Sequence, residues 1–307
     1  MPVANKHVLQ QGPVLASLAG AAVAALRQQL DAKLGRPAPT GMPPVPSQEF
    51  SATIPPRPDD LLRDYVRNCG GDPSAYRGMV PAHMFPQWGF PLSAKTLAGI
   101  PYPLVRVLNG GCRLQMNLPL PSGEPLHVRA RLEDIDDNGR RAVLHQRVVT
   151  GTDSAPDAVV ADLYAIVPLA GAKDGKREPK VTARVPDDAE ELQRWRIGPQ
   201  AGLEFAKLTG DFNPVHWVRA YARAAGFRST ILHGFATMAR AIEGLQRTIF
   251  AGSVHALRVV DVKFTKPLVL PAKVGLYLRG HEMYVGDAPG GPAYLVGTFE
   301  TNTKAET

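Results

Sequence analysis

Apolar and polar residues alternate with a period of two in several segments after Tyr102, and this pattern most narrows the folds open to the chain. Such alternation is typical of strands that bury one face. Turn residues at Asn109–Gly110, Ser122–Gly123 and Asn138–Gly139 separate the segments and favour hairpins. The pattern predicts strands within residues 104–120, 126–135, 140–151 and 158–169.

The same order of elements recurs later in the chain. Residues 170–180 are polar and almost free of large apolar side chains, which predicts a linker. Helical and motif segments follow over 187–250. Further alternating segments then predict strands within residues 255–270, 273–286 and 293–301. Two halves that each run from helices to an antiparallel meander favour two copies of one α+β fold.

The domain prediction follows from this layout. Residues 1–40 form an N-terminal extension with a helix over 14–26, and the prolines of residues 35–50 indicate an extended tether. The first repeat spans 41–170, the linker 171–180 and the second repeat 181–307. The apolar stretch at 14–26 is about 13 residues long, too short for a membrane span.

Composition limits the compartment and the partners. The two cysteines, Cys69 and Cys112, have neither metal-ligand nor disulfide spacing, so we expect free thiols in the cytosol. The formal charge is +7, but Lys and Arg are scattered rather than gathered in a basic stripe. This favours an acidic or phosphorylated partner over nucleic acid.

The longest predicted helix covers residues 234–250. A buried stripe at helical spacing predicts that it packs on a sheet, and its members are Phe235, Met238, Ala239, Ile242, Leu245 and Ile249. A second helix is predicted around residues 59–69 and a third around 90–99. His83, just before the third, is expected to pack within a loop, with a pocket wall as the alternative.

The stretch GDFNPVH places Asp211 five residues before His216. Asn213 is a favoured N-cap and Pro214 is tolerated at the first helical position, so a short helix is predicted to begin here and end near Gly226. The break between loop and helix lets Asp211 fold back beside His216. A carboxylate and an imidazole so placed hold one water molecule and move its proton.

A developing enolate oxygen needs a hydrogen-bond donor, and Gly234 is the candidate. It opens the long predicted helix, where backbone N–H groups lack intrahelical partners. Glycine also permits close approach of a thioester carbonyl, and one such donor contributes on the order of 3 kcal/mol.

The string FAKLTGDFNPVHWVRAYA, residues 205–222, resembles the signature of the MaoC-like, R-specific enoyl-thioester hydratases, and ILHGFATM resembles that family's oxyanion segment. The resemblance implies a double hot-dog fold, with two antiparallel sheets each wrapped around a central helix. It also implies that the second repeat is catalytic and that the first shapes the acyl pocket; residues 41–170 contain no GDxNPxH string. The activity implied is reversible syn hydration of trans-2-enoyl thioesters to (3R)-hydroxyacyl thioesters, with no metal or redox cofactor.

The resemblance assigns roles to individual residues. Asp211 and His216 activate water, Asn213 shapes the loop and Gly234 donates its amide to the thioester oxygen. Which of Asp211 and His216 is the principal base stays open. The predicted substrate-binding set is Arg219, Arg223, His233 and Phe235.

Each of these binding assignments has an alternative. Arg219 and Arg223, four residues apart on one helical face, suit a coenzyme A phosphate or an acidic carrier protein, and equally a solvated surface. His233 contacts substrate or only orders the loop through hydrogen bonds. Two other functions stay open, a thioesterase of the same fold and a non-catalytic scaffold of an acyl-chain synthase complex. A homodimer is also open, since symmetric pairing is common.

Overall fold

The structure is a computed structural model that describes residues 3–12, 20, 41–103, 107–169 and 182–302. Most of the helix predicted at 14–26 and all of the linker predicted at 170–180 lie outside these residues. The linker marks the predicted domain boundaries, so this division stays a prediction. Among the described residues, no helix has both the length and the apolar character that crossing a membrane requires.

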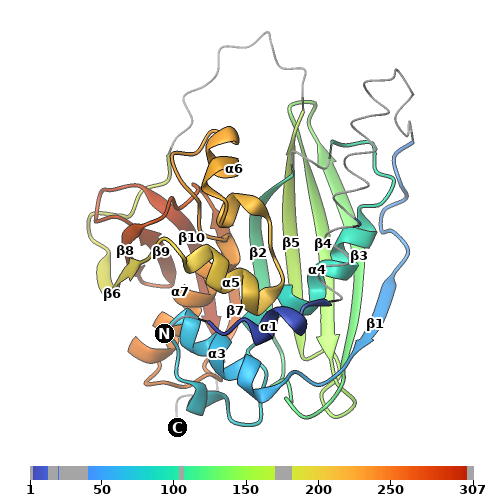
Figure 1. Ribbon diagram of the computed structural model, residues 1–307, viewed down its shortest axis with the longest axis horizontal. Helices are drawn as coiled ribbons and strands as arrows, with labels where there is room; N and C mark the ends of the chain where they lie inside the picture. The colour runs from blue at the N-terminus through green and yellow to red at the C-terminus, as the bar shows by residue number, and fades with distance from the viewer. Residues whose placement is uncertain (1–2, 13–19, 21–40, 104–106, 170–181, 303–307) are drawn as a thin grey trace.

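Within the described residues, ten strands form one antiparallel sheet in the order β1-β3-β4-β5-β2-β7-β10-β9-β8-β6 (Figure 1). The strands are β1 (Phe50–Ile54), β2 (Leu108–Met116), β3 (Leu126–Asp137), β4 (Arg141–Gly151), β5 (Val159–Pro168), β6 (Glu190–Ile197), β7 (Leu257–Phe264), β8 (Ala272–Arg279), β9 (Glu282–Gly286) and β10 (Ala293–Thr301). Each half of the chain contributes five of these strands, and the order from the edge to the centre is the same in both: β1-β3-β4-β5-β2 in the first half and β6-β8-β9-β10-β7 in the second. The two predicted sheets therefore exist as halves of one sheet, joined where β2 pairs with β7 and Arg113 lies opposite Asp261.

Helices lie against one face of this sheet (Figure 1). They are α1 (Lys6–Leu9), α3 (Asp59–Cys69), α4 (Pro86–Thr96), α5 (Ala201–Thr209), α6 (Arg219–Ala224) and α7 (Gly234–Thr248), with short 3-10 turns η1 (Pro73–Tyr76), η2 (Ala82–Met84) and η4 (Pro214–His216). Helix α4 contacts β1, β3 and β4 of the first half, whereas α7 contacts β6, β7, β9 and β10 of the second. Each half thus packs its own central helix on its own strands.

The buried stripe predicted for the long helix is confirmed along α7. Its members Phe235, Met238, Ala239, Ile242 and Leu245 are all buried. The prediction is wrong for Ile249, which is 42% exposed. Helix α7 ends at Thr248, so Ile249 lies beyond the last turn that faces the sheet.

The predicted strand segments correspond to β2–β5 and β7–β10, but two details of the prediction are wrong. Asn109–Gly110 is not a turn: β2 continues through it with a bulge, and a Cβ added at Gly111 would come within 2.4 Å of the Val262 carbonyl oxygen. The glycines here allow close strand approach rather than chain reversal. Residues 273–286 form two strands, because Gly280 (φ +57°) turns the chain between β8 and β9.

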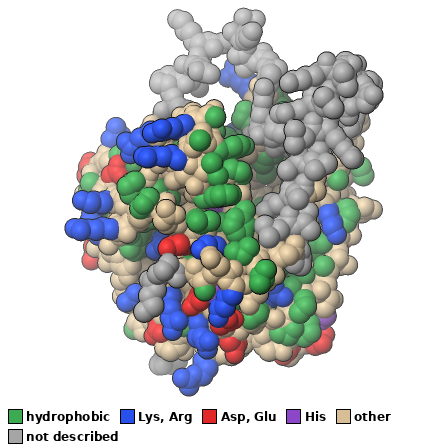
Figure 2. Space-filling view, in the orientation of Figure 1, with side chains coloured by type: hydrophobic (Ala, Val, Ile, Leu, Met, Phe, Trp, Pro, Cys, Tyr) green, Lys and Arg blue, Asp and Glu red, His purple; other side chains and the backbone are tan. Residues whose placement is uncertain are grey.

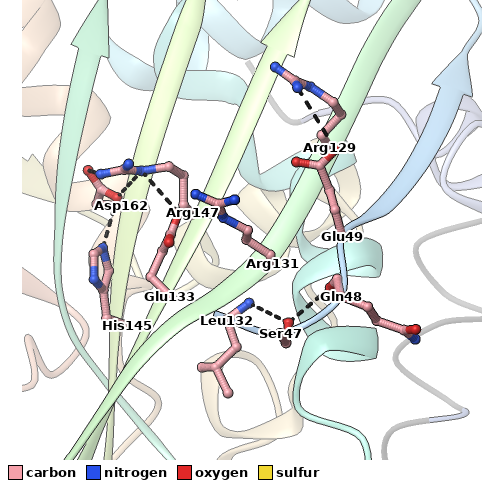
Figure 3. Close-up of polar contacts among 10 residues, drawn as sticks. All are labelled: Ser47, Gln48, Glu49, Arg129, Arg131, Leu132, Glu133, His145, Arg147 and Asp162. Carbon is pink, nitrogen blue, oxygen red and sulfur yellow. Dashed lines mark hydrogen bonds and ion pairs between the residues drawn. The ribbon is translucent and has the colours of Figure 1, made fainter. Parts of the chain in front are cut away.

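The opposite face of the first half carries a charged network (Figure 3). Asp162 on β5 accepts hydrogen bonds from His145 Nε2 at 2.8 Å and from Arg147 Nε at 2.8 Å. Burial raises the pKa of Asp162, but these two hydrogen bonds and the charges of Arg147 and His145 together outweigh burial and lower it. Residues 142, 144 and 146 of β4 are buried on the α4 side, so His145 and Arg147 point away from the helices. The network belongs to the outer surface of the sheet.

Candidate active site

Helix α5 delivers the chain to the predicted catalytic loop. It ends at Gly210, whose φ of +82° is a left-handed conformation that glycine adopts without strain. Asp211 follows immediately. The chain therefore turns sharply between a buried helix and the first polar residue of the loop.

Asn213 caps the turn that follows, as predicted. The side-chain oxygen of Asn213 accepts a hydrogen bond from the backbone N–H of Val215 at 3.3 Å. The backbone N–H of Asn213 donates to Asp211 Oδ1 at 3.3 Å. The single short helix expected here is instead two elements, the turn η4 that carries His216 and the separate helix α6. The chain leaves α6 at Gly226 (φ +90°), close to the predicted end.

The fold brings Asp211, His216 and His233 together. One oxygen of Asp211 and one ring nitrogen of each histidine all lie within 4.8 Å of one another. His216 Nδ1 is 2.9 Å from the Ile231 carbonyl oxygen, which can only accept, so Nδ1 carries the hydrogen. In the neutral ring, Nε2 is then left as the basic nitrogen.

His233 contacts both Asp211 and His216 of the loop. Its side chain is 2% exposed, its Nε2 donates to the Asp211 carbonyl oxygen at 3.0 Å, and its ring stacks on His216 with centroids 3.5 Å apart. Within the described part of the chain its Nδ1 has no hydrogen-bond partner. These contacts match the loop-ordering alternative, while contact with substrate stays a prediction.

Burial keeps both imidazoles neutral. It lowers the pKa of His216, and the charge of Asp211 and the bond to the Ile231 carbonyl offset only part of this effect. Burial and the neighbouring His216 lower the pKa of His233 to about 3. At neutral pH, His216 is therefore a base able to accept a proton.

The same three residues are of types that bind metal ions, but their geometry suits proton transfer better. The two rings are nearly parallel, 24° apart, so their nitrogen lone pairs run side by side instead of converging on one point. One nitrogen of each ring already donates to a backbone carbonyl. A metal ion with tetrahedral coordination needs ligand lone pairs that converge on one point, which these two rings do not provide.

Gly234 is the first residue of α7, as predicted, so its N–H has no acceptor within the helix. A Cβ at this position would lie 2.9 Å from the ring of Phe264, on β7. Phe235 is 4% exposed and packs edge-to-face on Phe264, Phe90 and Phe85. The start of α7 is thus held by an aromatic cluster, and contact of Phe235 with substrate stays a prediction.

Arg219 and Arg223 lie on the exposed face of α6, next to the loop. Neither forms an ion pair with any described residue. Trp217 and Tyr221 are also exposed there, at 42% and 52%. In Figure 2, basic side chains gather beside hydrophobic ones over this part of the molecule.

Two residues around the site escaped sequence analysis. Gly202, on α5, faces the backbone of His216: a Cβ there would come within 2.1 Å of the His216 carbonyl oxygen. A glycine within the helix-forming stretch AGLEFAKLT was the available signal. Gln11 contacts the end of α5, and nothing in the sequence indicated this. His83 is buried as expected; it also borders a cavity of about 70 Å³.

Residues 170–289 match the family model described as MaoC like domain. The enoyl-CoA hydratase ChsH3 of Mycobacterium tuberculosis is 30% identical over 172 residues, which cover 54% of this chain and 58% of that protein. The 3-hydroxyacyl-thioester dehydratase X of the same organism is 31% identical over 163 residues, which cover 52% and 55%. The chain therefore spans little more than half the length of these relatives.

Solved structures resemble a larger part of the chain. The crystal structure of HtdX from Mycobacterium tuberculosis gives a TM-score of 0.65 at 19% identity and covers 83% of this chain and 100% of that one. A second protein of that organism, with a double hot-dog fold, gives 0.54 at 14% identity and covers 84% and 96%. At these identities the likeness concerns the fold alone, and it confirms the predicted double hot-dog architecture.

Proposed function

We propose that the chain, whose residues 170–289 match the MaoC like domain, interconverts trans-2-enoyl and (3R)-hydroxyacyl thioesters by adding or removing water. One observation carries the proposal: a carboxylate and a neutral, partly buried imidazole converge beside the start of a long helix. The names of the two relatives, an enoyl-CoA hydratase and a hydroxyacyl-thioester dehydratase, support the same chemistry.

In the direction of hydration, the Asp211 carboxylate accepts one hydrogen bond from a water molecule and orients it. His216 Nε2 takes the other proton of that water molecule while the water oxygen forms a bond to C3 of the enoyl group. Electrons of the C2–C3 double bond move toward the thioester carbonyl, whose oxygen gains negative charge. The backbone N–H of Gly234 donates to that oxygen.

His216 then returns the proton to C2, so that one water molecule is added in total. Because hydroxyl and proton arrive from the same pair of side chains, both add to the same face of the substrate. Dehydration follows the same steps in reverse. The proposal needs neither a metal ion nor a redox group, and Asn213 contributes by holding the loop.

The thioester carrier is proposed to be coenzyme A or an acyl carrier protein. Arg219 and Arg223, exposed beside the loop, suit the phosphates of the first and the acidic surface of the second. Two buried free thiols, Cys69 and Cys112, support a reducing, cytosolic location. A homodimer is proposed on the general frequency of symmetric pairs.

The direct test is the loss of ultraviolet absorbance when the purified chain meets crotonyl-CoA and longer trans-2-enoyl thioesters, on coenzyme A and on carrier protein. We expect turnover with at least one substrate and no release of free thiol. Thiol release without hydration would identify a thioesterase. Absence of turnover on every substrate would favour the scaffold function. Sedimentation of the same sample tests the homodimer.

A further inference from the structure

An N-terminal segment lies against the helix that feeds the catalytic loop (Figure 1). Residues 3–12 contain α1, which is anchored on α3 by Lys6–Asp60 at 2.6 Å and His7–Asp64 at 2.8 Å. His7 and Gln11 are fully buried in the described structure. Burial of two polar side chains on so short a segment requires that each has specific partners.

Gln11 finds its partners at the C-terminal end of α5. The last carbonyl groups of a helix lack intrahelical donors. The Ala206 oxygen is satisfied by the Gly210 amide at 2.7 Å. The Lys207 and Leu208 oxygens instead accept hydrogen bonds from Gln11 Nε2, at 3.3 and 3.1 Å. One side-chain amide therefore caps the helix from another part of the chain.

The rest of the Gln11 amide is also occupied. Its Oε1 accepts a hydrogen bond from Gln87 Nε2, on α4, at 2.9 Å. Both donor hydrogens and the oxygen are thus used, which fixes the side chain in one orientation. Gln11 thereby links the N-terminal segment, the central helix of the first half and the helix that feeds the loop of the second.

Helix α5 sets the position of both members of the catalytic pair. Asp211 lies three residues after Leu208, across the glycine turn. The backbone of His216 packs directly against Gly202 of α5, where a Cβ atom would come within 2.1 Å of the His216 carbonyl oxygen. A shift or fraying of the end of α5 would therefore move the carboxylate relative to the imidazole.

We propose that Gln11 is a positioning residue for the Asp211–His216 pair, acting through the end of α5; this rests on the proposed function. Gln11 does not touch the reacting atoms. It lies outside residues 170–289, so the site of the MaoC-like domain is completed by a segment from the opposite end of the chain.

The test compares Gln11→Met, which keeps the side-chain volume but removes the donors, with Gln11→Ala and wild type. Gln10→Ala is the matched control, because Gln10 pairs with His7 and not with α5. We measure kcat and KM for enoyl-thioester hydration, the melting temperature, and amide hydrogen exchange over residues 209–216. Gln87→Met removes the donor that orients Gln11, together with the acceptor for Arg57 at 3.4 Å, and provides a second variant in case Gln11→Met does not fold.

For Gln11→Met we expect kcat to fall by about ten- to a hundred-fold, with KM within about two-fold, because misplacement of catalytic groups by about 1 Å has effects of this size. Exchange over 209–216 should accelerate, and Gln10→Ala should match wild type. Unchanged kcat would overturn the proposal. So would a loss explained entirely by the unfolded fraction.

If wild type itself shows no turnover, the proposed function fails, and amide exchange alone decides the positioning role. Faster exchange over 209–216 in Gln11→Met but not in Gln10→Ala supports it. Equal exchange in both variants overturns it.

Discussion

Both halves of the chain contain a helix that ends at a left-handed glycine and is followed by a capped 3-10 turn. Only the second half places the proposed catalytic residues at this turn. In the first half, α3 ends at Gly70 (φ +88°) and the turn η1 begins after Asp72, whose side chain accepts from the Ser74 amide. In the second half, α5 ends at Gly210 (φ +82°) and η4 begins after the capping Asn213. In both cases proline opens the turn.

The chain then returns to the sheet in matching ways. The Val80 amide donates to the Leu120 oxygen at 2.8 Å, and the Leu232 amide donates to the Leu268 oxygen at 2.8 Å. The next residues are Pro81 in the first half and His233 in the second. The backbones of the two halves therefore correspond up to this position, where His233 of the second half contacts the loop that carries Asp211.

The polar groups differ. In the first half, His83 Nε2 donates to Glu243 at 3.0 Å and its Nδ1 lies 3.1 Å from the Tyr65 hydroxyl, with both His83 and Glu243 only 2% exposed. A cavity of about 70 Å³ remains beside it, lined in part by Tyr76. In the second half, His216 uses only Nδ1, and no described residue bonds its Nε2. At the loop positions themselves, the first half has Gly71 and Ala75 where the second half has Asp211 and His216. The comparison teaches that the polar side chains placed on a shared backbone, rather than the backbone itself, separate the two sites.

The largest expected effect comes from the carboxylate. Asp211→Asn should lower turnover by about a thousand-fold, within the range for loss of acid–base catalysis, because an amide cannot orient the water as a carboxylate does. Binding of enoyl thioesters, measured by pull-down, should be retained. Asp72→Asn in the corresponding turn of the first half is the control and should leave turnover unchanged. Equal turnover in the two variants would contradict the assignment.

A smaller loss is expected at the start of α7. Gly234→Ala puts a methyl group 2.9 Å from the rigid Phe264 ring, so the N–H must move from its place. Turnover should fall by about a hundred-fold, as for removal of one oxyanion donor. Ala82, which opens the turn η2 of the first half, gives the reciprocal control, and Ala82→Gly should have no effect on turnover. A Gly234→Ala enzyme as fast as wild type would remove this residue from the mechanism.

Acid sensitivity should also be concentrated in the second half. The unfolded chain protonates His233 near pH 6.5, whereas the folded chain resists protonation until about pH 3, so the free energy of unfolding falls as the pH is lowered through this window. The slope from this one group is about 1.4 kcal/mol per pH unit. Denaturant titrations between pH 7 and 5 should show a shallower slope for His233→Gln, which keeps a donor for the Asp211 carbonyl. Identical slopes would show that His233 is not responsible.

The smallest effect is expected at the surface. Arg219→Ala and Arg223→Ala should raise KM by about two- to five-fold without changing kcat, because exposed ion pairs contribute about 1 kcal/mol or less. The effect should shrink as salt is added. Arg77, exposed after the corresponding turn of the first half, is the control. A change in kcat rather than KM would argue against a role in binding the carrier.

Sequence reasoning succeeded where one local signal determined the structure. The Asn213–Pro214 pair predicted the N-cap, although the single helix expected after it is two elements. The break between loop and helix predicted that Asp211 and His216 would approach each other. The α7 stripe predicted the buried face of the central helix. These signals act over a few residues, so they can be recognised without the rest of the fold.

The missed elements depend on distant partners. Strands β1 and β6 are the two edges of the sheet. β1 (FSATI) alternates but is only five residues long, and β6 (EELQRWRI) is mostly polar with little alternation. The contact between Gln11 and Leu208 joins residues 197 positions apart, and a lone glutamine gives no sign of it. Asn109–Gly110 misled for a related reason, because the neighbouring strands decide whether such a pair bulges or turns.

The central claim is that Asp211 and His216 together activate one water molecule and deliver both of its parts to one face of the substrate. Hydration of a trans-2-enoyl thioester in D2O, with the product examined by proton NMR, tests this most directly. The account predicts (3R)-hydroxyacyl product with a single deuterium at C2, added on the same face as the hydroxyl group. Deuterium on the opposite face, or distributed over both, would show that the proton and the hydroxyl group do not come from this pair.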